Sequence, residues 1–263
     1  MTAVAERQAT VGSLRADHIT VRFGGHIALE DVTIEAPVAG ITALIGPNGA
    51  GKSTFFNACS GLVKPDRGSV QLFGRELSNL APSARAQRGL GRTFQQMQLY
   101  DTLPVGTNVQ LGMEARVAGA NLLRTLWQPR AIRREIHGVR DEALALCGLE
   151  GLRDYPAGAL STGQRRMVEL ARAVAGRYSV LLLDEPSSGL DHSESEEFGR
   201  VLQRIVEREG TGILLVEHDI ALVRAVCDYA YVLDFGRLIA QGPTEEVMSS
   251  DLIRAAYLGA EVR

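Results

Sequence analysis

The sequence predicts an α/β fold whose sheet is mainly parallel, and three observations support this prediction. Two continuous apolar runs of strand length, 180–183 and 212–216, are each followed by an amphipathic helical pattern. A third apolar run, at 41–45, leads through a glycine-rich turn into another helical pattern. Strands that alternate with helices along a chain form parallel sheets with helices packed on their faces.

The N-terminal part of the chain is expected to be rich in strands. Apolar runs at 14–23, 31–36 and 41–46 predict three strands, separated by breaks at Gly24-Gly25 and at 37–40. A helical pattern follows from Gly51 to about Gly61, and residues 68–73 return to a strand pattern.

The middle of the chain predicts a mostly helical subdomain inserted into this strand-rich body. Between about residues 105 and 175 no convincing strand pattern occurs. Apolar side chains instead recur at helical spacing, at Ile136, Val139, Ala143 and Leu146 and again at Met167, Leu170, Ala171 and Val174. The C-terminal part then predicts a helix at 198–206, a helix at about 220–227, and a strand pair at 229–233 and 237–241.

Composition limits the class of protein. The chain has 263 residues, 45% of them hydrophobic and 22% charged, which excludes a disordered chain. A net charge of −3 gives no support to a nucleic acid as the main partner. No apolar run is long enough to span a bilayer, and residues 1–18 lack the apolar core of a secretion signal. The three cysteines, Cys59, Cys147 and Cys227, suggest a reducing compartment and are expected to be buried small hydrophobes without a redox role.

Residues 46–54 (GPNGAGKST) fit the phosphate-loop pattern G-x-x-x-x-G-K-[ST], between a predicted strand and a predicted helix. Small residues allow backbone N–H groups to turn inward around an anion, and the helix that follows directs its positive end at phosphate. We expect Lys52 to reach the β- and γ-phosphates of a nucleoside triphosphate and the Ser53 hydroxyl to ligate Mg²⁺. The residues expected to bind nucleotide here are Asn48, Gly49, Ala50, Gly51, Lys52, Ser53 and Thr54.

Two carboxylates follow the apolar run 180–183. Asp184 is suited to hold Mg²⁺ through water, and Glu185 is suited to polarise an attacking water as a general base. Taken alone, these two carboxylates could simply mark a strand that ends in a solvated acidic turn. Because the same chain also contains a phosphate loop, a catalytic pair is favoured.

Four further segments, in chain order, resemble motifs of the ABC-type ATPases. Phe94-Gln95 is similar to their Q-loop, 160–164 (LSTGQ) to their signature motif, 188–191 (SGLD) to their D-loop, and 216–219 (VEHD) to their switch-histidine segment. Together with the phosphate loop they cover nearly the whole chain. The resemblance implies a P-loop NTPase core with an N-terminal antiparallel β subdomain and an inserted helical subdomain. The expected division of the single domain 1–263 is a core at 14–95 and 176–263, with the helical subdomain at about 96–175.

The resemblance also implies a head-to-tail pair of such subunits that encloses two ATP molecules. Each ATP would lie on the phosphate loop of one subunit and be covered by Ser161, Gly163 and Gln164 of the other. Gln95 would sense Mg²⁺ and the attacking water, so Ser53, Gln95 and Asp184 form the expected metal site. His218 would hydrogen-bond the γ-phosphate, and Phe23 would stack on adenine, with ordinary strand packing as the alternative for that ring. One departure from the family pattern is Thr162, where the signature usually has glycine.

A finer resemblance is to the larger ATP-binding subunit of branched-chain amino acid importers. It rests on Phe23-Gly24-Gly25, on 92–95 (RTFQ), on 256–259 (AYLG) and on a helical extension at 121–137. It implies separate transmembrane permease subunits, an extracytoplasmic solute-binding protein, and a peripheral location on the cytoplasmic face of the membrane. Met97, Leu99 and Tyr100 are candidate permease contacts, with internal packing as the alternative.

Two questions stay open at this level. A non-transport ABC ATPase that remodels a ribosome or a nucleic-acid complex is the alternative function. The arginines around the extension could face lipid headgroups or RNA, although a solvated helix face is favoured because acidic residues balance the chain. They are Arg116, Arg124, Arg130, Arg133, Arg134 and Arg140.

Overall fold

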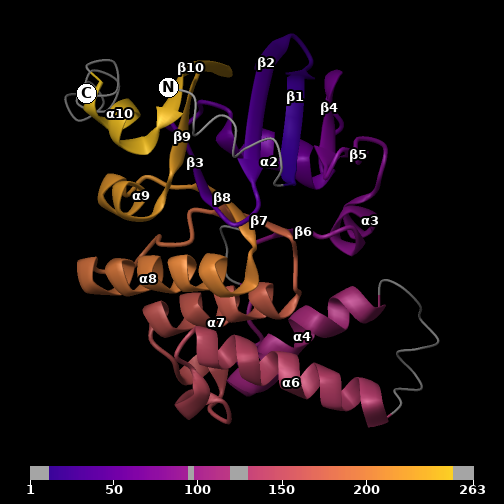
Figure 1. Ribbon diagram of the computed structural model, residues 1–263, viewed down its shortest axis with the longest axis vertical. Coiled ribbons are helices and arrows are strands. Elements are labelled where there is room, and N and C mark those ends of the chain that lie inside the picture. The colour runs from indigo at the N-terminus through magenta and orange to yellow at the C-terminus, as the bar shows by residue number, and fades with distance from the viewer. Residues whose placement is uncertain (1–11, 94–97, 119–129, 251–263) are drawn as a thin grey trace.

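The computed structural model describes residues 12–93, 98–118 and 130–250 (Figure 1). Two sheets organise this part of the chain. The smaller has the order β2-β1-β4-β5 and the larger the order β10-β9-β3-β8-β7-β6. Their strands are β1 (Ser13–Phe23), β2 (His26–Pro37), β3 (Ile41–Ile45), β4 (Arg67–Leu72), β5 (Arg75–Glu76), β6 (Leu90–Arg92), β7 (Val180–Asp184), β8 (Gly212–Val216), β9 (Tyr229–Asp234) and β10 (Arg237–Pro243).

The larger sheet is parallel except at one edge, which confirms the predicted α/β class. Strands β9, β3, β8, β7 and β6 pair in parallel, and β10 pairs antiparallel to β9. The smaller sheet is wholly antiparallel. The parallel strands follow one another through helices, since two parallel strands cannot be joined by a tight turn.

The continuous apolar runs are explained by burial on both faces of the larger sheet. In β3, alternate residues enter different cores: Ala43 belongs to the core on the helix side and Leu44 to the core shared with the smaller sheet. Leu181 and Leu182 divide between the two cores in the same way on β7. Because successive strand side chains point to opposite faces, a strand covered on both sides needs apolar residues at every position.

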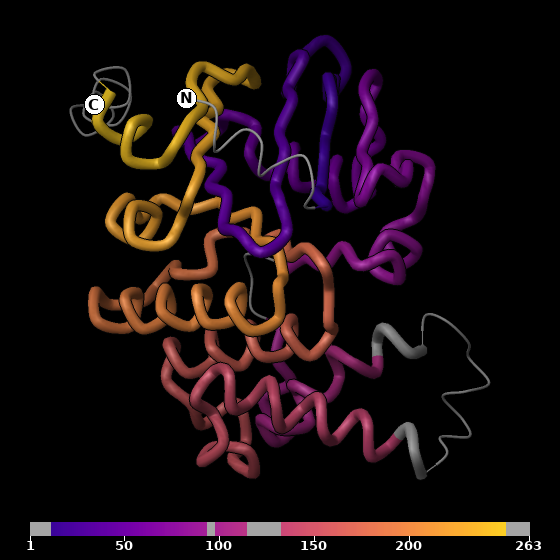
Figure 2. The backbone as a smooth tube through the Cα atoms, in the orientation of Figure 1, coloured from indigo at the N-terminus to yellow at the C-terminus, as the bar shows by residue number. Residues whose placement is uncertain are grey.

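The helices are α2 (Lys52–Ser60), α3 (Pro82–Gln87), α4 (Val105–Ala118), α6 (Arg130–Leu146), α7 (Thr162–Ala175), α8 (His192–Glu209), α9 (Ile220–Val226) and α10 (Thr244–Ser249). Figure 1 shows α4, α6 and α7 grouped on the far side of α8 from the sheets. The backbone trace in Figure 2 shows the chain leave the strand-rich region, build this helical group and return to it at β7. Within the described residues, no helix is long and apolar enough to cross a membrane.

The predicted helical spacing in the middle of the chain is confirmed. Ile136, Val139, Ala143 and Leu146 are all buried on α6, and on α7 Leu170, Ala171 and Val174 are buried while Met167 packs against the same core. No strand forms in the described residues between 105 and 175. The three cysteines are free thiols and buried, as expected.

The boundaries of some strands were not predicted correctly. β2 begins at His26 rather than at residue 31, because it pairs with β1 as far as the turn at Gly24-Gly25. The sequence analysis did not find β5 and β6, which have two and three residues. Runs this short carry no periodicity of their own, and β6 exists because it pairs with β7.

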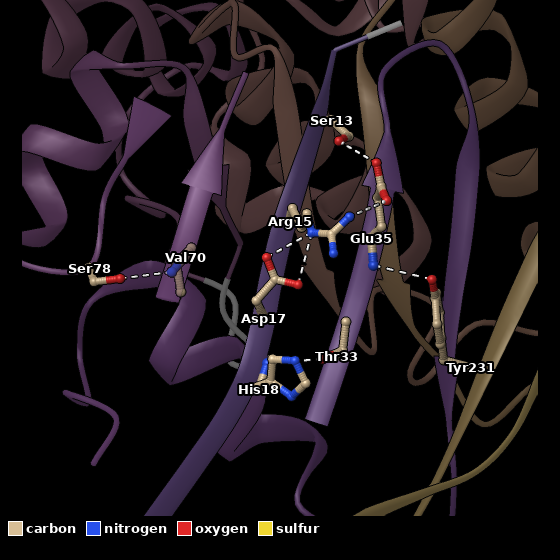
Figure 3. Close-up of polar contacts among 9 residues, drawn as sticks. All are labelled: Ser13, Arg15, Asp17, His18, Thr33, Glu35, Val70, Ser78 and Tyr231. Atoms are coloured by element: carbon tan, nitrogen blue, oxygen red, sulfur yellow. Dashed lines mark hydrogen bonds and ion pairs between the residues drawn. The ribbon is translucent and has the colours of Figure 1, made fainter. Parts of the chain in front are cut away.

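Polar contacts join β1 to β2 within the smaller sheet, and a hydrogen bond from β2 to β9 links this sheet to the larger one (Figure 3). Arg15 on β1 contacts Asp17 at 2.7 Å and Glu35 of β2 at 3.6 Å. The backbone N–H of Glu35 donates to the Tyr231 hydroxyl on β9 at 3.2 Å. This bond holds the antiparallel sheet beside β9. Strand β9 is the neighbour of β3, and β3 leads into the phosphate loop.

Candidate functional site

The phosphate loop lies between β3 and α2, and its glycines adopt backbone conformations that fit no other residue. Gly46 and Gly51 have φ angles of 152° and 106°. A Cβ atom at Gly46 would lie 2.0 Å from the Leu233 carbonyl oxygen, and one at Gly51 would lie 2.7 Å from that of Ala28. Only glycine combines this φ with such close backbone contact. The loop is therefore shaped by its neighbours β9 and β2.

Lys52 lies at the first position of α2, and its ammonium group folds back onto the loop. Nζ donates hydrogen bonds to the carbonyl oxygens of Gly46 at 2.7 Å and Pro47 at 3.0 Å. Burial lowers the pKa of Lys52, while the charges of Glu185 and Asp184 act in the opposite direction. The lysine thus lies at the loop beside both carboxylates, where an incoming phosphate can replace the carbonyl contacts.

An open cavity of about 310 Å³ lies over the phosphate loop. Its lining includes Asn48, Gly49, Gly51, Lys52, Ser53 and Thr54 from the loop, and Phe23, His26, Ala28 and Glu185 from elsewhere. The Phe23 ring is 53% exposed, so it lies at the cavity and belongs to neither hydrophobic core. His26 faces Phe23 in the β1–β2 pairing. Sequence analysis missed His26, although its position across a two-residue turn from Phe23 was an available signal. Ala50 is buried beneath the loop and does not line the cavity.

Glu185 and His218 are brought together from loops that follow neighbouring parallel strands. His218 Nε2 lies 2.9 Å from Glu185 Oε1. Glu185 has a φ of 48° and its N–H donates to the Val216 carbonyl oxygen, which turns the residue out of β7 toward the next strand. A carboxylate at this position and an imidazole beside it can accept and stabilise a proton during hydrolysis.

Glu217 holds the two loops together and was not singled out from the sequence. Its side chain is 2% exposed and accepts hydrogen bonds from the N–H groups of Ser187 at 2.8 Å and His218 at 3.0 Å. Asp219 next to it caps α9, since its carboxylate accepts from the N–H groups of Ala221 and Leu222. The switch-histidine segment is thus fixed on both sides of His218.

Asp184, at the end of β7, is only 5% exposed. Burial raises the pKa of this carboxyl group, and the nearby Arg92 guanidinium counteracts the shift by contacting Oδ2 at 3.1 Å. The Ser53 hydroxyl at the cavity and the Asp184 carboxylate are hard oxygen donors of the kind that Mg²⁺ prefers. This donor set fits an ion held by a few protein oxygens, water and phosphate. The described residues contain no group of three or more His, Cys, Asp or Glu side chains that could hold a metal by itself.

The predicted signature residues lie at the start of α7. Ser161 caps this helix: its hydroxyl accepts from the Gln164 N–H at 3.2 Å, and the Gln164 side chain accepts from the Ser161 N–H at 3.1 Å. A Cβ at Gly163 would lie 2.3 Å from Glu194 Oε1, so glycine also permits close packing within this chain. The cavity over the phosphate loop contains none of these signature residues.

The D-loop segment lies against the signature helix. Arg166 on α7 donates through Nε and Nη2 to the Ser188 carbonyl oxygen, both at 3.3 Å. A Cβ at Gly189 would lie 3.6 Å from the Thr162 Cγ2 methyl, so the departure at Thr162 places a methyl group beside the D-loop. The two motifs are therefore in contact within one chain.

Several predicted positions lie outside the described residues: Phe94, Gln95, Met97, the segment 256–259 and most of the extension 121–137. Of the candidate permease contacts that are described, Leu99 packs against the hydrophobic core, while Tyr100 is 57% exposed. Arg133 and Arg134 are exposed on α6, and Arg140 pairs with Asp141 at 2.8 Å. The side chains of Arg116, Arg124 and Arg130 are outside the described set.

Comparison with known proteins identifies relatives of this arrangement. A family model described as "ABC transporter" matches residues 29–188. The branched-chain amino acid transport ATP-binding protein LivG of Salmonella typhimurium is 34% identical to this chain, and the match covers 94% of this chain and 97% of LivG. The branched-chain amino acid transport ATP-binding protein BraF of Pseudomonas aeruginosa is 32% identical, with 94% of this chain and 97% of BraF covered. The lipopolysaccharide export ATP-binding protein LptB of Escherichia coli is 32% identical over 96% of this chain and 100% of its own. An ATP-binding cassette of an ABC transporter, solved in its ADP conformation, has a TM-score of 0.82 at 29% identity and covers 95% of this chain and 100% of its own.

Proposed function

The chain belongs to the ABC transporter family and is an ATP-binding, ATP-hydrolysing subunit of a transporter, and we propose that it powers the import of branched-chain amino acids or a similar small solute. ATP hydrolysis is supported by one observation above all: Lys52 of the phosphate loop and Glu185 line the same cavity. The observation that favours amino acid import is the match to branched-chain amino acid transport proteins along 94% of the chain.

Nucleotide binding follows from the loop geometry. The triphosphate lies over the loop 46–53, at the positive end of α2. Lys52 exchanges its hydrogen bonds to the Gly46 and Pro47 carbonyl oxygens for bonds to the β- and γ-phosphates. The half-exposed ring of Phe23 stacks on the adenine, with His26 beside it at the cavity.

Hydrolysis uses the two residues that contact each other after β7 and β8. Glu185 polarises the attacking water, and His218 orients Glu185 and hydrogen-bonds the γ-phosphate. Ser53, Asp184 and Gln95 would hold Mg²⁺, which would neutralise the negative charge that develops on the phosphates. Glu217 keeps the two loops at a fixed separation through its hydrogen bonds to Ser187 and His218.

A second ATPase subunit completes each site in this proposal. Ser161, Gly163 and Gln164 do not line the chain's own cavity, which supports their use on a nucleotide held by a partner. Ser161 keeps its own hydroxyl proton free to be donated, because the hydroxyl oxygen serves as the acceptor in the helix cap. A pair assembled head to tail places each signature over the opposite phosphate loop.

The chain's organisation and location are also proposals. Residues 14–95 and 176–263 form the nucleotide-binding core, and about 96–175 form the helical subdomain. Transmembrane permease subunits dock beside this helical subdomain, where Tyr100 is exposed, and an extracytoplasmic solute-binding protein delivers the solute. The subunit is then peripheral on the cytoplasmic face of the membrane.

Lipopolysaccharide export is a second candidate, because LptB matches as much of the chain at nearly the same identity. The relatives reported above serve transport systems, so a role on ribosomes or nucleic acid is not favoured. The choice between amino acid import and lipid export depends on which partner subunits the chain binds.

The test has a biochemical and a cellular part. Purified chain is expected to release phosphate from ATP, and Lys52→Ala should lose ATP binding, whereas Lys64→Ala, which changes an exposed lysine just beyond α2, should not. Cells lacking the chain should lose uptake of labelled leucine, isoleucine and valine, and the parent chain but not Glu185→Gln should restore it. Normal uptake together with impaired lipopolysaccharide export would reject the importer in favour of the second candidate.

A further inference from the structure

Arg92 is a buried cation that joins the strand β6 to both halves of the nucleotide site. Its side chain is 9% exposed, and that of Asp184, with which it pairs, is 7% exposed. In the parallel pairing of β6 with β7, Arg92 lies opposite Leu182, two residues before Asp184. The guanidinium therefore extends along the sheet toward the end of β7.

Arg92 also contacts residues of the phosphate-loop helix. Nη1 donates to Asn57 Oδ1 at 2.7 Å and to Ser60 Oγ at 3.0 Å, and the guanidinium carbon lies 5.7 Å from the centre of the Phe56 ring. Nη2 donates to Asp184 Oδ2 at 3.1 Å. One planar cation thus bonds to α2, which begins at Lys52, and to β7, which ends at Asp184.

This arrangement resembles the way in which proteins fix a metal-binding carboxylate. Such a carboxylate is oriented by hydrogen bonds from a neighbouring group, and the loss of that neighbour typically weakens metal binding about 10–100-fold. Arg92 donates to Oδ2 of Asp184, and its bonds to Asn57 and Ser60 hold the same guanidinium against the helix that carries Ser53. The Asp184 carboxylate is thereby kept at a fixed place relative to that helix.

We propose that Arg92 is a positioning residue for the Mg²⁺ of the ATPase reaction, acting by holding the Asp184 carboxylate at a fixed distance from the phosphate-loop helix. The proposal rests on the assignment of Asp184 to the metal under the proposed function. It adds a residue that the phosphate-loop and carboxylate motifs do not contain. Arginine suits this role better than lysine, because its planar group bonds to several acceptors at once in a fixed geometry.

The experiment measures how much Mg²⁺ strengthens nucleotide binding. The dissociation constant of a non-hydrolysable ATP analogue is determined by calorimetry in EDTA and in excess Mg²⁺, and the ratio of the two values is compared among variants. In Arg92→Met we expect the ratio to fall roughly tenfold, while the constant measured in EDTA stays near that of the parent. Arg92→Lys, which keeps the charge but only part of the hydrogen bonding, should give an intermediate ratio.

Two controls make the outcomes distinct. Asp184→Asn should lose the Mg²⁺ effect; if it does not, the metal assignment of the proposed function fails. If Asp184→Asn loses the effect while Arg92→Met keeps the parent ratio, the role of Arg92 alone is rejected. A fall in affinity that is equal with and without Mg²⁺ would show that Arg92 only supports packing and would also overturn the proposal. Asn57→Ala removes one hydrogen bond of Arg92 and leaves its ion pair with Asp184, so the ratio of the two dissociation constants should fall less than in Arg92→Met. This variant tests the proposal even if Arg92→Met does not fold.

Discussion

His218 Nε2 lies 2.9 Å from Glu185 Oε1, across the gap between the loops that follow β8 and β7. Each residue is also held through its backbone N–H, which donates to the Val216 carbonyl oxygen in Glu185 and to the Glu217 side chain in His218. Glu185 also lines the cavity that contains Lys52, so under the proposed function the γ-phosphate would lie beside this pair. The positions of the carboxylate and the imidazole are set by the sheet, because each residue follows one of its parallel strands.

The first prediction concerns Glu185→Gln. The amide keeps the size of the side chain but cannot accept a proton from water, so phosphate release should fall by roughly 100-fold or more. ATP affinity should remain, because the phosphate loop and Lys52 are unchanged. Size-exclusion chromatography with ATP and Mg²⁺ should then show a trapped pair of chains. Glu207→Gln, which changes a residue near the end of α8 outside the cavity, is the matched control and should hydrolyse ATP like the parent. Normal turnover in Glu185→Gln would reject its role.

The second prediction concerns the ring of Phe23 at the cavity. Stacking of an aromatic side chain on a base contributes about 1–3 kcal/mol, so Phe23→Ala should weaken ATP binding roughly tenfold while Phe23→Tyr should not. Titration calorimetry measures the effect. Phe73→Ala removes another exposed ring, 46% exposed and outside the cavity, and should leave the affinity unchanged. Equal affinities for Phe23→Ala and the parent would assign the base to another surface.

The third prediction concerns Arg85, which is 2% exposed and packs under the C-terminal end of the phosphate-loop helix. Its guanidinium donates to the carbonyl oxygens of Ala58 at 2.8 Å, Cys59 at 2.6 Å, Ser78 at 2.9 Å and Leu80 at 3.0 Å. Arg85→Met leaves these oxygens buried without that donor, so the free energy of unfolding should fall by about 3 kcal/mol or more. Urea unfolding measures it, and Arg88→Met, an exposed arginine just beyond α3, should change it little.

The fourth prediction concerns the buried thiols at alkaline pH. Burial raises the pKa of Cys59 and that of Cys147 to about 12. In the unfolded chain these thiols ionise near pH 8.5, so their contribution to stability is full below that pH and is lost as pH rises toward 12. Each thiol should lower the free energy of unfolding by about 1.4 kcal/mol per pH unit within this range. Replacing Cys147 by alanine should make the fall between pH 8 and pH 10 less steep, and an unchanged slope would contradict the predicted pKa.

The sequence predicted which chemical groups would lie close together where a motif combines residue type with spacing. The phosphate loop, Asp184-Glu185 and His218 each follow an apolar run, and those runs became β3, β7 and β8 of one parallel sheet. Because parallel strands end at the same edge, residues placed after them meet without further information. This is why the contact between Glu185 and His218 could be expected from two distant segments.

Other parts of the site depend on how the strands pair and carry at most a weak local signal in the sequence. His26 reaches the cavity because β2 pairs with β1 up to the turn, although its own sequence shows no nucleotide-binding pattern. Glu217 was visible only as a neighbour of His218, and its burial between two loops depends on the whole sheet. Arg92 belongs to the segment 92–95 (RTFQ), but its contact with Asp184 had no local signal, since the three-residue strand β6 exists by its pairing with β7.

The sequence by itself determined the fold class, the phosphate-binding loop and the order of the chemical groups along the chain, because periodicity and short motifs are local properties. Only the tertiary structure decided which groups touch. It put Phe23 at the cavity instead of in a core, placed Ser161 away from the chain's own phosphate loop, and aimed Arg92 at Asp184 across 92 residues of sequence. The physical reason is that these contacts depend on strand order and helix packing, which burial of apolar surface sets for the chain as a whole.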